Sequence, residues 1–242
     1  MSSYRAMRRE AHREADGFTL VEMAMVLMIV ALLLGGLLPT ISSQVEQRQI
    51  NETRKQLDEI QQALIGFAVV NGRLPRPATS AINGDERAAC TTTAACIGFI
   101  PWATLGSSKL DSWGKIIRYG VAPVFAGDNT GTTAFTLSTT TTTKTIQTRD
   151  STGALITLAN QVPAVIFSHG KNNWGTDDSG NALADSSTTN ADEDTNNASS
   201  TNFISRINSG STTVTGGEFD DLVIWLSPNI LFNRMVTAGK LP

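Results

Sequence analysis

Near the N-terminal end of the chain, hydrophobic residues form one long apolar run. Residues 18–38 contain no Lys, Arg or Asp and a single acidic side chain, that of Glu22. A helix rises about 1.5 Å per residue, so a run of roughly 21 residues matches a hydrocarbon core about 30 Å thick. The pattern therefore predicts a membrane-spanning helix over residues 18–38.

After Pro39 the pattern changes to that of an amphipathic helix. Apolar side chains recur at near-helical spacing with charged residues between them: Val45, Ile50, Leu57, Ile60, Leu64 and Phe67. The helix is therefore expected to continue over residues 39–70, with one face packed on a folded domain. Because proline lacks a backbone N–H and two glycines precede it, we expect a kink or a locally melted segment over residues 35–39. Asn71 and Gly72 then predict the end of the helix.

The remaining residues, 71–242, combine short apolar segments with long polar loops and predict an outward-facing, β-rich globular domain. Strands are expected at residues 116–124, 134–137, 144–148, 155–158, 164–167, 202–207 and 222–226. The predicted fold class is α+β, in which the long N-terminal helix packs on an antiparallel β-sheet. Asp220 and Asp221, just before the last strand, are interpreted as turn and surface residues.

A short C-terminal helix is predicted after that last strand. Ser227 is suited to the N-cap and Pro228 to the first helical position, so the helix should run from Pro228 to Thr237. Its inward-facing residues are expected to be Ile230, Leu231 and Met235, and Gly239 is placed to end it.

The charge distribution bears on orientation and on partners. Arg5, Arg8, Arg9 and Arg13 precede the apolar run, which predicts a cytoplasmic N-terminus for a single-pass segment. The whole chain has a formal net charge of -3, from 19 Lys and Arg against 22 Asp and Glu. Such a mildly acidic chain has no bulk attraction for nucleic acid, which is therefore not an expected partner.

The N-terminal residues carry a family resemblance. Residues 17–22, Gly-Phe-Thr-Leu-Val-Glu, followed by the apolar helix with Pro39 near its end, resemble the N-terminus of type IV prepilins and type II secretion pseudopilins. The resemblance implies that residues 1–17 are a leader, which an inner-membrane prepilin peptidase removes between Gly17 and Phe18. The new N-terminal residue, Phe18, would then be N-methylated. A plain uncleaved membrane anchor is the alternative interpretation.

The same resemblance implies a pilin-like fold and a structural role. The chain would be a minor subunit of a type IV pilus or of a type II secretion pseudopilus. Its partners would be other pilin or pseudopilin subunits, the prepilin peptidase and an inner-membrane assembly platform. It would reside in the inner membrane before assembly, and in a periplasmic or cell-surface filament afterwards.

Glu22 is the residue of this segment that needs a partner, because a carboxylate within an apolar helix costs free energy in lipid. The resemblance implies that Phe18 and Glu22 act in assembly. The charged amine of Phe18 would pair with Glu22 of a neighbouring subunit, and a charge-assisted hydrogen bond would offset the cost of burying both groups.

A second, weaker resemblance lies in the globular part. Asp111, Ser112, Trp113 and Gly114 resemble the D-P-W-G hairpin of pseudopilins, although Ser112 replaces the first proline and Ile116 the second. An acidic turn residue, a Trp that covers the core and a Gly suited to positive φ are expected to form a tight turn before a strand.

Cys90 and Cys96 are the only cysteines. In an oxidising periplasm we expect them to form a disulfide that closes a small loop. A redox C-x-x-C motif has closer spacing, and a zinc site needs more Cys or His ligands than this segment contains.

The loop over residues 170–201 is rich in acidic and amide side chains. Asp177, Asp178 and Asp185 are candidate Ca²⁺ ligands, since some pseudopilins bind calcium in a late β-loop. The EF-hand spacing is missing, however, and a solvated acidic loop is the alternative. No cofactor is required by either interpretation.

No enzymatic motif was found, and we expect no catalytic residue. The chain lacks G-x-S-x-G, H-E-x-x-H and P-loop sequences, and His169 is the only histidine beyond the leader. A binding module remains as the alternative function. In that case a filament-borne adhesin would use the Thr-rich segment, residues 127–153, together with the acidic loop.

Overall fold

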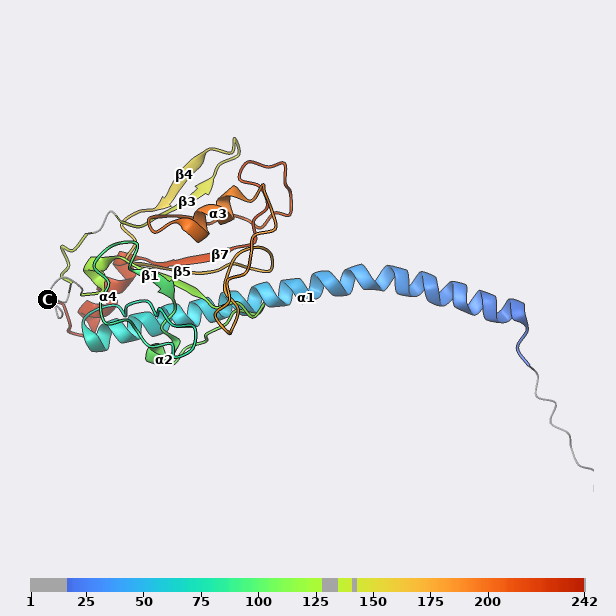
Figure 1. Ribbon diagram of the computed structural model, residues 1–242, viewed down its shortest axis with the longest axis horizontal. Coiled ribbons are helices and arrows are strands. Elements are labelled where there is room, and N and C mark those ends of the chain that lie inside the picture. Colours follow the sequence, from blue (N-terminus) through green and yellow to red (C-terminus); the bar gives the residue numbers. More distant parts are fainter. Residues whose placement is uncertain (1–16, 128–134, 141–142, 242) are drawn as a thin grey trace, which may run out of the picture. The chain divides into compact units, whose positions relative to one another are not determined.

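The computed structural model describes residues 17–127, 135–140 and 143–241, and for residues 34–41 it describes the backbone only (Figure 1). Residues 1–16 with the arginines of the leader, residues 128–134 and part of the threonine run, residues 141–142, lie outside the described residues. The described elements follow the order α1 (Leu20–Asn71), β1 (Ile97–Phe99), α2 (Trp102–Leu105), β2 (Arg118–Val121), η1 (Pro123–Phe125), β3 (Thr145–Arg149), β4 (Leu155–Ala159), β5 (Ala164–Ser168), α3 (Ala191–Ala198), β6 (Asn202–Ile204), β7 (Leu222–Leu226) and α4 (Pro228–Thr237). The fold class is α+β, as predicted.

The chain forms two compact units, residues 1–46 and residues 47–242. Helix α1 contributes residues to both and is continuous over 52 residues. The melted segment expected over residues 35–39 is therefore not formed. The helix ends at Asn71, where the sequence placed its end, and Gly72 adopts a φ of 71°. Glycine reaches this left-handed conformation without steric cost, which explains why the helix stops there.

Two sheets form the β-structure of the larger unit. The first has the strand order β1-β2-β5-β7, and every neighbouring pair in it is antiparallel. The second has the order β4-β3-β6, in which β3 and β6 are parallel. The sheet on which α1 packs is antiparallel, as predicted, and the parallel β3–β6 pair belongs to the second sheet. A parallel pair needs a long connection, and the chain between β3 and β6 supplies one that includes β4, β5 and α3.

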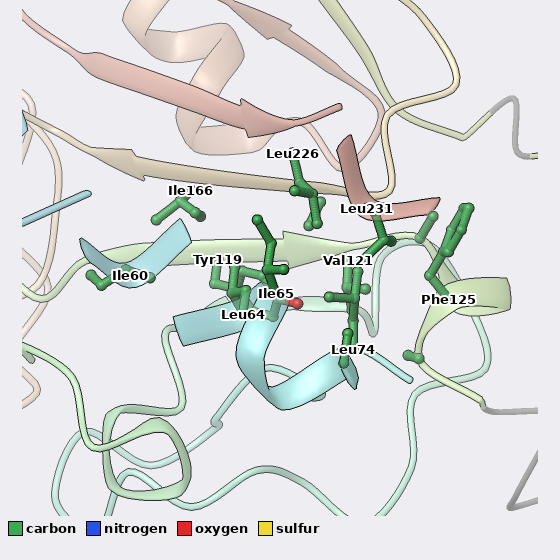
Figure 2. Close-up of a cluster of buried hydrophobic side chains, with 14 of the residues drawn as sticks. Ile60, Leu64, Ile65, Leu74, Tyr119, Val121, Phe125, Ile166, Leu226 and Leu231 are labelled. Carbon is green, nitrogen blue, oxygen red and sulfur yellow. The ribbon is translucent and has the colours of Figure 1, made fainter. Parts of the chain in front are cut away.

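The main core lies between the C-terminal part of α1 and the first sheet (Figure 2). Ile60, Leu64 and Ile65 of α1 pack against Tyr119 of β2 and Ile166 of β5. The helical spacing of these side chains gives α1 one apolar face, and burying that face supplies the hydrophobic stabilisation of the domain.

Strand β5 is buried on both faces. Ala164 and Ile166 join the core with α1, whereas Val165 and Phe167 join a second cluster that includes Phe203 of β6. Successive side chains of a strand point to opposite faces. The first sheet is therefore a middle layer, with α1 against one face and the β3–β6 sheet against the other (Figure 1).

Several predicted elements differ in detail from the observed ones. Strand β1 and helices α2 and α3 were not predicted. Residues 135–137 are not a strand, and Phe135 instead packs its ring against Phe125 and Phe232. The predicted strand 116–124 is shortened to β2, because η1 begins at Pro123.

Helix α4 has the predicted bounds, Pro228–Thr237. Leu231 and Met235 are buried as expected, but Ile230 is 50% exposed and does not face the core. Gly239 follows the helix with a φ of 67°. Ser227 occupies the N-cap position, although its side chain makes no capping hydrogen bond.

Candidate functional site

The N-terminal segment shows how the residues implicated in processing and assembly are placed. Gly17 and Phe18 lie ahead of α1 and are exposed. Thr19 caps the helix: the backbone N–H of Glu22 donates to Thr19 Oγ1 at 3.2 Å, and the backbone N–H of Thr19 donates to Glu22 Oε2 at 2.8 Å. This reciprocal arrangement is a capping box. Sequence reasoning assigned Glu22 only to a neighbouring subunit and missed this local role.

The apolar side chains that follow the cap are exposed. From residue 18 to residue 33 no described side chain is buried, and exposure reaches 82% at Phe18 and 88% at Leu20. Within the residues that were described, no helix has the length and apolar character of a membrane span. The side chains of residues 34–41 lie outside that description, so the predicted span is described only in part.

The expected disulfide is present. Cys90 and Cys96 are bonded, with their Cα atoms 5.1 Å apart, and both residues are buried. The bridge closes a short loop just before β1.

The three aspartates proposed as calcium ligands do not converge. Asp177 accepts hydrogen bonds from the backbone N–H groups of Ser179 and Asn181, which is an Asx turn. Asp178 forms an ion pair with Lys109, and Asp185 caps a separate turn at Ser187. Among the described residues, the acidic group whose ligand atoms all lie within 4.8 Å of one another is a different one: Glu193, Asp220 and Asp221.

The turn at residues 111–115 has the predicted local structure and an unpredicted connection. Asp111 Oδ1 accepts the backbone N–H groups of Trp113 and Lys115, each at 2.9 Å. Gly114 has a φ of 80°, as the turn requires. Asp111 Oδ2 accepts the hydroxyl of the buried Ser168 at 2.6 Å, which ties the turn to the end of β5. Burial raises the pKa of Asp111, while the hydrogen bond from Ser168 acts in the opposite direction.

Lys115 is the centre of the site. Its side chain is inside the protein, with the residue only 5% exposed. Its ammonium donates to three backbone carbonyls of one loop: His169 at 3.3 Å, Asn172 at 2.5 Å and Asn173 at 2.7 Å. Burial lowers the pKa of Lys115, and the nearby carboxylates, first that of Asp220, oppose this shift. We call these three carbonyls the carbonyl cage.

The carboxylates of Asp220 and Glu193 hold the loop that forms the carbonyl cage. Asp220 Oδ2 accepts the N–H groups of Lys171 and Asn172 at 3.1 and 2.8 Å. Glu193 Oε1 accepts the N–H of Asp220 at 2.7 Å, and Glu193 Oε2 accepts the side-chain amide of Asn173 at 3.2 Å. Burial raises the pKa of Asp220 to about 7, and the negative charges of Glu193 and Asp221 act in the same direction.

Asp221 and His169 complete this cluster of side chains and are both buried. Asp221 is 3% exposed, so its interpretation as a surface residue was wrong. Its Oδ1 atom lies 3.4 Å from His169 Nδ1, and its Oδ2 accepts the side-chain amide of Asn196 at 2.8 Å. The ring of His169 packs edge-on against Phe167. The hydroxyl of Ser168 donates its hydrogen bond to Asp111 and not to His169.

The acidic loop is not simply solvated. Residues 191–198 form α3, whose inward-facing side chains are polar: Asp192, Glu193 and Asn196 are all buried. Asp192 accepts hydrogen bonds from two guanidinium groups, from Arg149 at 2.6 and 2.8 Å and from Arg206 at 2.7 Å. The helix was missed because it has no apolar periodicity, so no hydrophobic signal marks it in the sequence.

Comparison of the chain with protein-family models, with curated proteins and with solved structures gives no match.

Proposed function

We propose that this protein is a structural subunit, of minor stoichiometry, of a type IV pilus or a type II secretion pseudopilus, with a pilin-like fold. One observation carries the proposal. A single helix, α1, presents large apolar side chains to its surroundings over residues 20–33 and buries an apolar face against a sheet over its C-terminal turns.

The exposed part of α1 needs a covering. Soluble proteins rarely expose a contiguous apolar surface of this kind without a partner or a lipid phase. Lipid would cover these side chains before assembly, and helices of neighbouring subunits would cover them in a filament. Both coverings are apolar, so a helix of this composition can pass from one to the other at modest cost in free energy.

The capping box suggests how Glu22 takes part. Removal of residues 1–17 would leave Phe18 as the N-terminus, one residue ahead of the cap at Thr19. The carboxylate of Glu22 would then cap its own helix and also accept a hydrogen bond from the charged amine of Phe18 in a neighbouring subunit. A carboxylate has two oxygens and can accept several hydrogen bonds, so the two roles are compatible.

Two substitutions separate the capping role of Glu22 from its pairing with the amine of a neighbouring subunit. Glu22→Gln keeps an acceptor for the capping box but removes the charge, whereas Glu22→Ala removes both. Terminal sequencing should find that wild type and both variants begin at Phe18. Both variants should enter sheared filaments roughly ten- to a hundredfold less than wild type, since charge-assisted hydrogen bonds contribute about 1.5–3 kcal/mol.

Glu59→Ala is the matched control, because Glu59 lies on α1 and, among the described residues, forms an ion pair with the exposed Lys55. This variant should assemble normally. Normal assembly of Glu22→Gln would leave only the capping role. A mature wild-type chain that retains residues 1–17 would exclude the filament proposal and leave a tethered envelope protein.

The adhesin alternative requires the loops to offer polar groups to a ligand. In the acidic loop, however, Asp192 and Glu193 are buried and bonded within the protein. The Thr-rich segment can be tested without disturbing the core if the buried Phe135 is kept. Residues 136–143 would be replaced by a Gly/Ser segment of equal length. Intact filaments that lose surface attachment would support the adhesin.

A further inference from the structure

We propose that the ammonium of Lys115 is the built-in cation of the loop over residues 169–175. It fills the position that a divalent metal ion would otherwise take in an oxygen-lined loop of this kind. The site would therefore need no metal, and removal of the Lys115 side chain would convert it into a divalent cation site. This inference does not depend on the proposed function.

The first support is the occupancy of the carbonyl cage. Hard cations such as Ca²⁺ bind through oxygen ligands, and backbone carbonyls are common among them. Here the carbonyls of His169, Asn172 and Asn173 all accept hydrogen bonds from Lys115 Nζ. An ammonium has three N–H groups, so its donors are fully used by this one loop. The carbonyl oxygens of the cage are thus already engaged by an ammonium.

The second support is the backbone that forms the cage. Asn173, Trp174 and Gly175 follow one another with φ values of 32°, 40° and 105°. Non-glycine residues seldom adopt positive φ, and they do so where the surrounding structure compensates for the strain. Three hydrogen bonds from one ammonium, two of them to the carbonyls of residues 172 and 173, provide such compensation.

The loop also fits the stem of the lysine side chain. A Cβ atom at Gly175 would lie 2.9 Å from Lys115 Cδ, closer than non-bonded carbon atoms approach. The loop therefore passes directly over the aliphatic part of Lys115 and can do so only because residue 175 is glycine. The cage is shaped around the lysine and not around an ion alone.

The third support is the distribution of charge. Asp220, Asp111, Asp221 and Glu193 all act electrostatically on Lys115. Asp220 Oδ1 and Asp221 Oδ1 are buried and accept no hydrogen bond from the described residues. One ammonium thus serves several carboxylates. Without it, the same carbonyls and carboxylates would form an anionic, oxygen-lined site with no cation.

Binding of a metal ion beside Lys115 is less favourable than occupation of the site by the Lys115 ammonium alone. A divalent ion at the carboxylates would lie close to a buried ammonium, in surroundings where charges are weakly screened. It would also lack the carbonyl ligands that Lys115 occupies. Binding of Ca²⁺ and the presence of Lys115 should therefore exclude each other.

The experiment compares the full-length wild type in detergent micelles with Lys115→Ala. Thermal unfolding would be followed by circular dichroism in EDTA and over a series of Ca²⁺ concentrations. Wild type should shift by less than about 1 °C with Ca²⁺. Lys115→Ala should unfold roughly 6–12 °C lower in EDTA, because a buried charge cluster loses its partner. Ca²⁺ should recover at least half of this loss in a saturable way.

Lys109→Ala is the matched control. Lys109 also donates to a carbonyl of the acidic loop, that of Asp178 at 2.8 Å, but its pair with the Asp178 carboxylate is exposed. This variant should change little in EDTA and should not respond to Ca²⁺. A Tb³⁺ titration adds a direct binding readout, since Trp174 lies beside the cage and can sensitise Tb³⁺ emission. Only the Lys115 variant should give a saturable signal.

Two results would overturn the proposal. Saturable stabilisation of the wild type by Ca²⁺ would show that the carboxylates of Glu193, Asp220 and Asp221 bind metal with Lys115 in place. A folded Lys115→Ala that neither responds to Ca²⁺ nor binds Tb³⁺ would show that the cage is no cation site. If Lys115→Ala does not fold in either condition, Lys115→Met, which keeps an unbranched stem of similar length without the charge, would be measured in the same way and judged by the same criteria.

Discussion

Helix α3 places two adjacent acidic residues in two different environments. Asp192 is held by the guanidinium groups of Arg149 and Arg206, with contacts from 2.6 Å. Glu193, the next residue, accepts hydrogen bonds from a backbone N–H and from side-chain amides, and it neighbours Asp220. We call the first region the arginine clamp and the second the acidic ring.

The comparison shows two ways of burying negative charge. In the arginine clamp, each oxygen of Asp192 meets a fixed positive charge in a geometry suited to carboxylates. In the acidic ring, several carboxylates share one ammonium, that of Lys115, which contacts carbonyls instead of carboxylates. The ring is expected to respond to pH.

The largest effect should come from breaking the arginine clamp. Asp192→Ala leaves the guanidinium groups of Arg149 and Arg206 without their carboxylate in a partly buried position. We expect the free energy of unfolding to fall by about 3–5 kcal/mol, as for other broken buried pairs. Urea denaturation followed by circular dichroism would measure it.

Asp194→Ala is the control for this substitution, because Asp194 lies on the same helix and is exposed. Its carboxylate accepts one hydrogen bond, from Trp174. The control should lose only about 1 kcal/mol. Equal losses for the two variants would mean that the clamp has no special energetic role.

The second effect is a pH dependence from the acidic ring. The pKa of Asp220 is raised to about 7 in the folded protein, against about 3.9 for an unfolded Asp. The stability that its proton provides is fully present below about pH 3.9 and is lost as the pH rises through about 7. Asp220→Asn mimics the protonated side chain and removes this dependence.

The variant should therefore gain on wild type as the pH rises. We expect the difference in unfolding free energy to grow by roughly 2 kcal/mol between about pH 5 and about pH 8. Urea denaturation at both pH values would test this. A difference that stays constant with pH would show that Asp220 does not titrate in this range.

The smallest effect should come from a partly exposed ion pair between Lys109 and Asp178 of the acidic loop. Solvent screens such a pair, so Lys109→Ala should cost less than about 1 kcal/mol, and added salt should reduce even this. A cost as large as that of breaking the arginine clamp would contradict the view that burial determines how much these ion pairs contribute to the free energy of unfolding.

Much of the fold was predictable because local signals specify it. Gly72 ends α1, Ser227 and Pro228 begin α4, and the spacing of Cys90 and Cys96 indicated their bond. Strand β1 was missed because three residues are too few for a periodic pattern.

The site was less predictable for a different reason. Lys115 donates to backbone carbonyls that lie more than fifty residues later in the chain. Every residue has such a carbonyl, so the side chains in the sequence do not indicate which carbonyls a lysine will contact. Asp220 and Asp221 carried a signal, as adjacent acids before an apolar strand. Their burial depends on how α3 packs, and α3 itself has no hydrophobic pattern.

The turn that presents Lys115 is also fastened to α1. The N–H of Ser112 donates to Thr53 Oγ1 at 3.1 Å, and the side chain of Gln49 donates to the carbonyl of Ser112 at 3.2 Å. Tension along this part of the helix would therefore reach the turn directly. Through Asp111 and Lys115 it would pass on to β5 and to the loop that follows it. The turn is therefore one of the points at which helix, sheet and loop would be loaded together, beside the packing of α1 on the first sheet.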